Sequence, residues 1–235
     1  MKLTQNTRGS FPNVKNVLGM DRYLTHILTL FYVSLAMAVA RDVTSDNHVL
    51  LRATSPFEDM AEAALAKNER GISKSLAAAD ARAANVRAVI SPPASAHFDD
   101  LLQKLHSAAS SKEHLVLAAN AVEVFRLLID SVKPEGLKVP KEVSLLDYAG
   151  FKLHVLTSAP HPDWVAIRRT VGDADGWWMT TRPAVSDKAL RDAFDSTIRG
   201  LHEAEKQESV PMLSFAAQID LDLVDLIERY FESRK

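Results

Sequence analysis

The sequence has no cysteine and only eight glycines in 235 residues. Without cysteine, the chain has no disulfides, thiolate metal sites, cysteine nucleophiles or haem attached through Cys-x-x-Cys-His. The glycines form neither a Gly-x-Ser-x-Gly elbow nor a phosphate-binding loop, and the zinc motif His-Glu-x-x-His is missing. These absences remove the commonest sequence signals of catalysis.

The chain also lacks an excess of charge of either sign. It carries 28 basic and 30 acidic residues, for a formal net charge of −2. Nucleic-acid binding depends on clustered lysine and arginine, so we expect no nucleic-acid partner. A composition with 47% hydrophobic and 25% charged residues is typical of a folded domain.

The most apolar segment is short. Ile27–Ala40 follows the basic Arg22 and ends with Ala38 and Ala40 at the −3 and −1 positions of a small-residue cleavage site. Crossing a bilayer requires about 20 apolar residues, which is more than this segment offers. The pattern predicts an export signal over residues 1–40, cleaved after Ala40.

Cleavage would leave residues 41–235 as a single helical domain in the periplasm or medium, with no stable membrane span. Two alternatives stay open at this end of the chain. The apolar segment is kept as an anchor, or translation begins at Met20 rather than Met1, because the residues before Met20 are unlike a basic n-region.

The second half of the sequence repeats the first. At an offset of about 96 the matched pairs are Phe98/Phe194, Asp99/Asp195, Leu105/Leu201, His106/His202 and Ala108/Ala204; at 98 they are Ala118/Ala216, Ala119/Ala217, Leu128/Leu226, Ile129/Ile227 and Asp130/Glu228. Each copy has the pattern of a helix, a break and a second amphipathic helix. We therefore predict an all-α antiparallel helical bundle built from two duplicated helical hairpins, with pseudo-repeats at about 55–133 and 140–233.

Proline and polar residues mark the expected helix ends. Ser55-Pro56-Phe57-Glu58 has the form of a capping box, which predicts a long helix from there to Pro92. Further helices are predicted over about 95–132, 141–157, 163–181, 186–208 and 209–233, with a kink or division of the third helix at Pro160 and Pro162.

Core and surface positions follow from helical spacing. Phe125 and Leu223 are expected at the centre of the bundle. The last helix carries its apolar residues at core spacing: Met212, Phe215, Ala216, Ile219, Leu223, Leu226, Ile227 and Tyr230. Its acidic residues, Asp220, Asp222, Asp225 and Glu228, are expected on a solvated face.

Two histidines are weak candidates for a metal or haem site. His106 and His202 occupy equivalent places in the two copies, so a twofold relation between the hairpins can bring them together around a metal. The structural alternative is that each covers the edge of a core. The Glu-x-x-His pair of di-iron bundles is missing, and no cofactor is favoured.

Tryptophan and arginine gather in the second copy. Trp177, together with Arg168, Arg169 and Arg182, can line a cleft for an anionic or aromatic ligand or mark a partner surface. Trp164 and Trp178 lie fourteen residues apart on one helical face and are expected in the core.

Three functions stay open at this stage. The favoured one is a noncatalytic, exported helical-bundle protein that binds a protein partner or a small ligand. The second is a metal- or haem-binding four-helix-bundle protein, and the third is an enzyme of unrecognised type. The ligand, the partner and the oligomeric state do not follow from the sequence.

The export signal makes the first testable prediction. The mature protein should begin at Arg41, because Ala38 and Ala40 provide the small side chains that signal peptidase accepts. Mass spectrometry of the N-terminal peptide from a periplasmic fraction measures this directly. An intact leader recovered with the membranes would contradict it.

Overall fold

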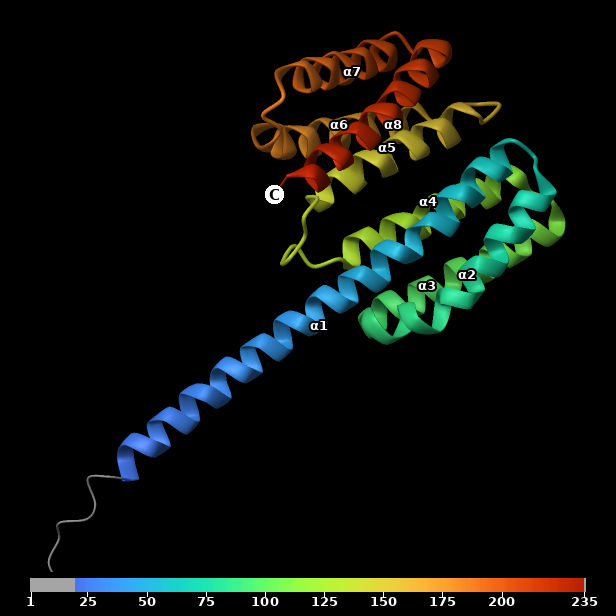
Figure 1. The fold of residues 1–235 in the computed structure, drawn as a ribbon. Coiled ribbons are helices and arrows are strands. Elements are labelled where there is room, and N and C mark those ends of the chain that lie inside the picture. Colours follow the sequence, from blue (N-terminus) through green and yellow to red (C-terminus); the bar gives the residue numbers. More distant parts are fainter. Residues whose placement is uncertain (1–19, 235) are drawn as a thin grey trace, which may run out of the picture. The chain divides into compact units, whose positions relative to one another are not determined.

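The computed structural model describes residues 20–234 of the chain, with side chains from Val43 onward, and this part is helical (Figure 1). Its helices are α1 (Met20–Leu65), α2 (Glu69–Val89), α3 (Pro92–Ser111), α4 (His114–Ser131), α5 (Lys141–Thr157), α6 (Trp164–Thr181), α7 (Lys188–Lys206) and α8 (Val210–Ser233), with a 3-10 turn at Arg182–Ala184. No strand occurs in residues 20–234, which confirms the all-α class.

The predicted export signal and its cleavage site lie outside the residues whose side chains are described, and residues 1–19 lie outside the described chain altogether. Across the described part, no helix combines the length and the apolar character needed to cross a membrane.

Helix ends in the first half differ from the prediction. Helix α1 continues through Pro56, so Ser55 does not cap a new helix. The proline is tolerated because it and the neighbouring Ala53 and Phe57 are buried in a core, whose packing outweighs the one lost helical hydrogen bond.

Each of the first two predicted helices is divided in two. Lys67 and Lys112 adopt left-handed backbone conformations, with φ of 53° and 56°, and end α1 and α3 without glycine or proline. Asn68 then caps α2 by accepting a hydrogen bond from the Gly71 N–H. The third predicted helix is divided as expected, and Asp163 caps α6 through the N–H groups of Val165 and Ala166.

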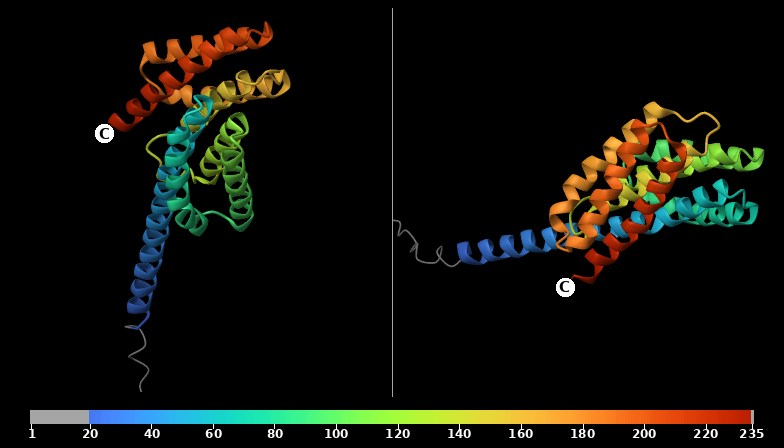
Figure 2. Two further views of the ribbon diagram at one scale, coloured as in Figure 1. Left: turned by 90° about the vertical axis from the view of Figure 1, so that its right-hand side faces the viewer. Right: turned by 90° about the horizontal axis from the view of Figure 1, so that it is seen from above.

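The buried residues form two apolar clusters within the compact unit Val43–Lys235. Helices α1, α2, α3 and α4 form one cluster, together with Leu145, Tyr148 and Val155 of α5. Helices α5, α6, α7 and α8 form the other. The views in Figures 1 and 2 agree in showing α5 to α8 as one group of helices. Helix α5 therefore contributes side chains to both cores.

Burial confirms only part of the expected core. Trp178 and Phe125 are buried, whereas Trp164 is partly buried at the edge of the second cluster. Leu223 is also only partly buried, so its expected place at the centre of the bundle is wrong. Helix α8 turns this residue toward α7 and the surface.

Close packing of α8 on α5 depends on Gly150. A Cβ atom added to Gly150 would lie 2.5 Å from Leu221 Cδ2, 2.7 Å from Leu221 Cγ and 3.1 Å from Asp220 Oδ2. Distances this short require the two helices to separate or Leu221 to leave its position. The absence of a side chain at Gly150 thus sets the spacing of α5 and α8.

We expect Gly150→Ala to lower the free energy of unfolding by about 1 kcal/mol or more, because overpacking outweighs the gain in helix propensity. Gly172→Ala is the matched control in α6, where nothing lies within 4 Å of the added Cβ. It should stabilise the protein by about 0.5–1 kcal/mol. Urea denaturation measures both changes, and equal stabilisation by the two substitutions would show that Gly150 does not set the spacing.

Candidate functional site: an acidic cavity

Helices α1, α4, α5 and α8 surround a cavity of about 460 Å³. Five carboxyl side chains line it: Glu58 from α1, Asp147 from α5, and Asp225, Glu228 and Glu232 from α8. Three helices that are distant in sequence thus direct acidic groups into one space.

Apolar side chains form much of the remaining wall. Phe125 and Ile129 contribute from α4, and Leu137 and Val139 contribute from the segment between α4 and α5. Beside this wall Glu58, Asp147 and Glu228 are partly buried, whereas Asp225 and Glu232 are exposed. Partial burial strengthens the electrostatic contacts that the first three can make.

Two lysines lie at the cavity without neutralising it. The Nζ group of Lys138 donates a hydrogen bond to the backbone carbonyl of Glu232. Lys141 makes no ion pair with any residue of the described chain. Asp147 and Glu228 likewise have no hydrogen-bond partner within residues 43–234. Asp225 is paired with Arg229 of its own helix, at 3.6 Å. Glu58, Asp147, Glu228 and Glu232 form no ion pair within residues 43–234, so the cavity has more carboxyl groups than cations.

Burial changes the acidity of these groups. It raises the pKa of Glu58 to about 7, an effect opposed by the nearby Thr54 hydroxyl and reinforced by the nearby charge of Glu228. Burial is the main cause that raises the pKa of Asp147 well above its usual range. The surrounding carboxylates raise it further, and among them Glu58 has the largest effect. Burial also raises the pKa of Glu228.

Asp220 of α8 is fully buried behind the cavity wall, at the contact with Gly150. Neither of its carboxyl oxygens has a hydrogen-bond partner in the described chain, and burial raises its pKa well above the usual range. The expectation that the acidic residues of this helix share a solvated face is therefore wrong for Asp220, although Asp222 and Asp225 are exposed.

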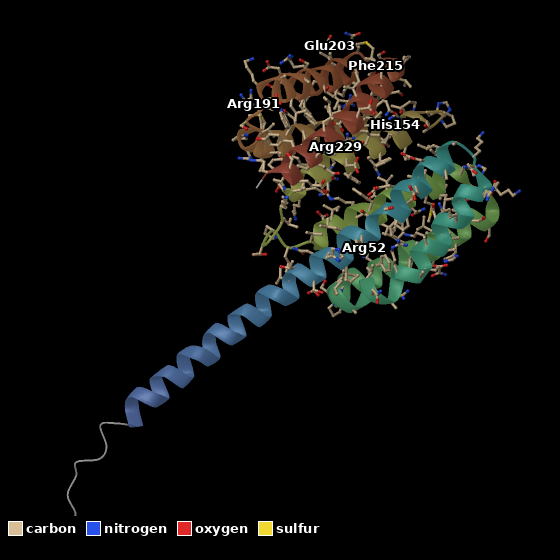
Figure 3. All side chains as sticks on the ribbon, viewed as in Figure 1. Arg52, His154, Arg191, Glu203, Phe215 and Arg229 are labelled. Atoms are coloured by element: carbon tan, nitrogen blue, oxygen red, sulfur yellow. The ribbon has the colours of Figure 1, made fainter. Side chains whose placement is uncertain are left out.

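His154, labelled on α5 in Figure 3, lies one helical turn after Gly150. Its Nε2 atom is buried without a partner in residues 43–234, and burial lowers its pKa. Burial therefore favours the uncharged form of this imidazole.

His106 and His202, the predicted candidates for metal ligands, each contact an aspartate at the protein surface. His106 Nε2 is 2.9 Å from Asp80 Oδ1 of α2, and His202 Nε2 is 3.3 Å from Asp175 Oδ2 of α6. Each histidine therefore pairs with the preceding helix of its own half. No group of three or more histidine, aspartate or glutamate side chains is placed to hold a metal ion in the described residues.

Trp177 packs between the two halves. Its ring makes an edge-to-face contact with Tyr148, with 6.2 Å between centroids, and the Arg126 guanidinium lies 4.8 Å from its centroid. These contacts partly bury the indole and hold it against α4 and α5. Burial raises the pKa of Tyr148, which therefore stays neutral at this contact.

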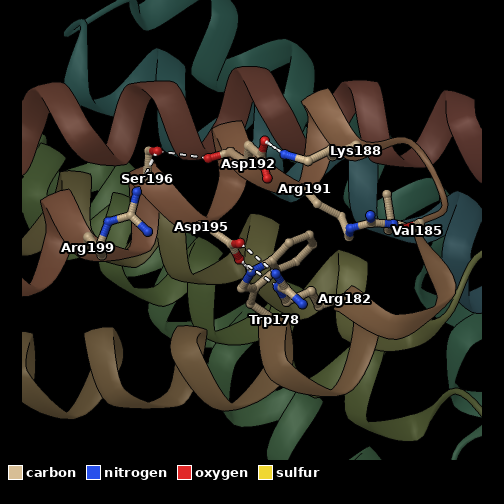
Figure 4. Close-up of polar contacts among 9 residues, drawn as sticks. All are labelled: Trp178, Arg182, Val185, Lys188, Arg191, Asp192, Asp195, Ser196 and Arg199. Carbon is tan, nitrogen blue, oxygen red and sulfur yellow. Dashed lines mark hydrogen bonds and ion pairs between the residues drawn. The ribbon is translucent and has the colours of Figure 1, made fainter.

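The predicted arginines contact other neighbours. Arg182 donates to both carboxyl oxygens of Asp195, at 2.8 and 2.9 Å, and Trp178 donates to the same residue at 2.7 Å (Figure 4). These hydrogen bonds, led by that of Arg182, lower the pKa of Asp195 to about 2.

Arg168 lies 3.7 and 3.6 Å from the carboxylates of Glu205 and Glu208, whereas Arg169 is exposed. The four predicted ligand-binding residues, Trp177, Arg168, Arg169 and Arg182, thus face different neighbours along α6. The structure does not gather them into one cleft, and ligand or partner binding through them stays a prediction.

The cavity was missed by the sequence analysis because its acidic residues come from three separate segments. Within the last helix, Asp220 falls among apolar neighbours, with Ile219 before it and Leu221 after it. That position inside an apolar stretch was the available signal of burial.

Comparison with models of known families, with curated proteins and with solved structures finds no match for this chain.

The buried carboxyl groups predict an inverse dependence of stability on pH. Their pKa values are raised in the folded state, so between about pH 4.5 and 7 the unfolded chain binds fewer protons than the native protein. Stability is accordingly greatest near pH 5 and falls as the pH approaches 7.5.

Asp220→Asn removes one ionisable group with little change in shape. We expect this variant to unfold at a higher urea concentration than the wild type at pH 7.5, with a smaller difference between pH 5 and 7.5. Asp222→Asn, on the exposed face of the same helix, is the control and should leave the pH dependence unchanged. A wild type that gains stability steadily from pH 5 to 7.5 would refute this account.

Proposed function

We propose that this protein is a noncatalytic, exported binding protein, acting in the periplasm or outside the cell, whose small ligand occupies the acidic cavity. The observation that carries the proposal is the set of three partly buried carboxyl groups, Glu58, Asp147 and Glu228, that line one cavity and form no ion pair in the described residues. Burying ionisable groups in this way is unfavourable for folding alone, and such groups concentrate at functional sites.

The chemistry of the walls favours an organic ammonium ion as the ligand. Carboxylates form strong charge-assisted hydrogen bonds with ammonium groups, and Phe125, Ile129 and Leu137 offer contact to a hydrocarbon chain. A bare divalent cation requires several converging oxygen ligands, and the described residues hold no such set. A short alkyl amine or diamine can pair its ammonium group with the carboxylates and place its hydrocarbon chain against the apolar side chains.

A binding role also suits the absence of catalytic partners around the cavity. The residues that line it include carboxyl groups, two lysines and the hydroxyls of Thr54 and Ser144, but no histidine. The Thr54 hydroxyl lies near Glu58 but donates to the carbonyl of Leu51, so that carboxyl group does not activate it as a nucleophile. The favoured reading is capture of the ligand without chemical change.

We further propose that the two halves are duplicated units, each of four helices. Matching contacts support this: Arg87 Nε lies 2.7 Å from Asp99, as Arg182 Nε lies 2.8 Å from Asp195, and the two histidine–aspartate pairs also correspond. The duplication then relates α1 to α5 and α4 to α8. These are the helices around the cavity, so the site lies where the two units meet.

Isothermal titration calorimetry with 1,4-diaminobutane tests the proposed ligand class. We expect saturable binding at pH 7.5, and no binding of 1,4-butanediol, which has the same carbon chain without charge. Because an ammonium group favours ionised carboxylates, binding should release protons, and the measured heat should depend on the ionisation enthalpy of the buffer. Mg²⁺ is included to test binding of an inorganic cation.

Asp147→Asn should weaken diamine binding by about 10- to 100-fold, because a charge-assisted hydrogen bond contributes roughly 1.5–3 kcal/mol. Asp222→Asn is the matched control and should bind as the wild type does. Equal binding by Asp147→Asn and the wild type, or no heat from the diamine between pH 6 and 8, would rule out the proposal.

A further inference from the structure

Helix α8 is apolar on two faces. Leu213, Val224 and Ile227 face the second core, as the fold requires. On the other side Phe215 is 69% exposed, Leu226 is 46% exposed and Met212 is 41% exposed, with Ile219 and Leu223 partly buried between them. We call the face formed by Met212, Phe215, Ile219, Leu223 and Leu226 the outer face of α8. The monomer leaves much of this apolar face exposed to solvent.

A hollow of about 460 Å³ lies beside the outer face, between α7 and α8. Small side chains of α7 form its floor, among them Ala193, Thr197 and Gly200. The Thr197 hydroxyl donates to the carbonyl of Ala193 within its own helix. The hollow therefore has space for an apolar side chain. Filling it would not leave the Thr197 hydroxyl without a hydrogen bond.

The first half shows what covers the matching face of α4. Lys112 and Glu208, with φ of 56° and 50°, hold the same place before α4 and α8. Aligning these two turns keeps the offset at 96 through α4 and α8, in place of the 98 expected from the sequence match. It matches three α4 positions to the outer face: Ala119 with Phe215, Glu123 with Ile219 and Leu127 with Leu223.

Helix α5 packs on that face of α4. Glu123 accepts a hydrogen bond from Lys152 of α5, and the Arg126 guanidinium lies 5.0 Å from the centroid of the Tyr148 ring. In the part of the chain that the structure describes, no helix covers the outer face of α8 in this way. The outer face of α8 thus has the apolar character of a helix-packing surface, but no helix packs on it in the described residues.

We propose that the outer face of α8 is the interface of a twofold homodimer, in which Phe215 of each copy enters the hollow of the other. A twofold interface requires one patch to contain both the projecting group and its receptor, and this patch contains both. Phe215, labelled in Figure 3, projects from α8 next to the hollow.

Head-to-tail association, in which α1 of one copy would cover the outer face of another, is disfavoured by the polar surface of α1. Under the proposed duplication, the surface that corresponds to the covering face of α5 lies on α1, where Arg52, Ser55, Asp59 and Glu62 are exposed. Burying these groups against Phe215 and Leu223 would remove their hydration without supplying partners. A second copy therefore presents α8, not α1, to the outer face.

Sedimentation equilibrium of the purified protein tests the dimer. We expect a single monomer–dimer equilibrium, with the dissociation constant raised at least about 30-fold by Phe215→Asp, since aromatic groups at the centre of an interface carry much of its binding energy. Val165→Asp is the matched control, because Val165 is 72% exposed on α6, and it should leave the constant unchanged. Circular dichroism verifies that both variants are folded.

A second measurement tests the symmetry. Because the chain has no cysteine, Ile219→Cys introduces a single thiol at the centre of the outer face. Mild oxidation should give a covalent dimer with Ile219→Cys and not with Val165→Cys. A wild type that stays monomeric at 100 μM, a series of ever larger assemblies, or equal cross-linking of the two thiols would overturn the proposal.

Discussion

Close packing of α8 against α5 removes carboxyl groups from water, and the rest of the site depends on this contact. Gly150 lets the helices approach until Asp220 is buried beside it without a hydrogen-bond partner. Asp147, one turn before Gly150, then faces the cavity with Glu58 and Glu228 nearby. Proton uptake relieves the electrostatic penalty, and the proposed ammonium ligand would relieve it by charge pairing.

The same fold treats another carboxyl group in the opposite way. Asp195 receives hydrogen bonds from Arg182 and Trp178, which lower its pKa to about 2, whereas burial without a cation raises that of Glu58 to about 7. The Arg182–Asp195 ion pair connects the 3-10 turn after α6 to α7, and the Arg87–Asp99 ion pair connects α2 to α3. Paired acids thus hold each half together, and unpaired acids gather where the halves meet.

Sequence reasoning reached the helical class, the division between α5 and α6, and the cap at Asp163, because proline and side-chain caps act locally. It missed the turns at Lys67 and Lys112, since left-handed backbone at lysine has no strong signature in a single sequence. It also assigned Asp220 to the surface and Phe215 to the core, and the structure shows the reverse. Both errors concern α8, which is apolar on two faces, so helical periodicity alone does not distinguish its buried side.

The central claim is that the Asp147 and Glu58 carboxyl groups bind protons more tightly than ordinary carboxyl groups, and that a bound cation lowers their pKa values. Carbon-detected NMR titration of the Asp147 and Glu58 carboxyl groups, with and without 1,4-diaminobutane, tests it most directly. The account predicts midpoints well above the ordinary carboxyl range of about 4 in the free protein, and lower midpoints with the diamine. Ordinary midpoints in the free protein, or midpoints that the diamine leaves unchanged, would contradict it.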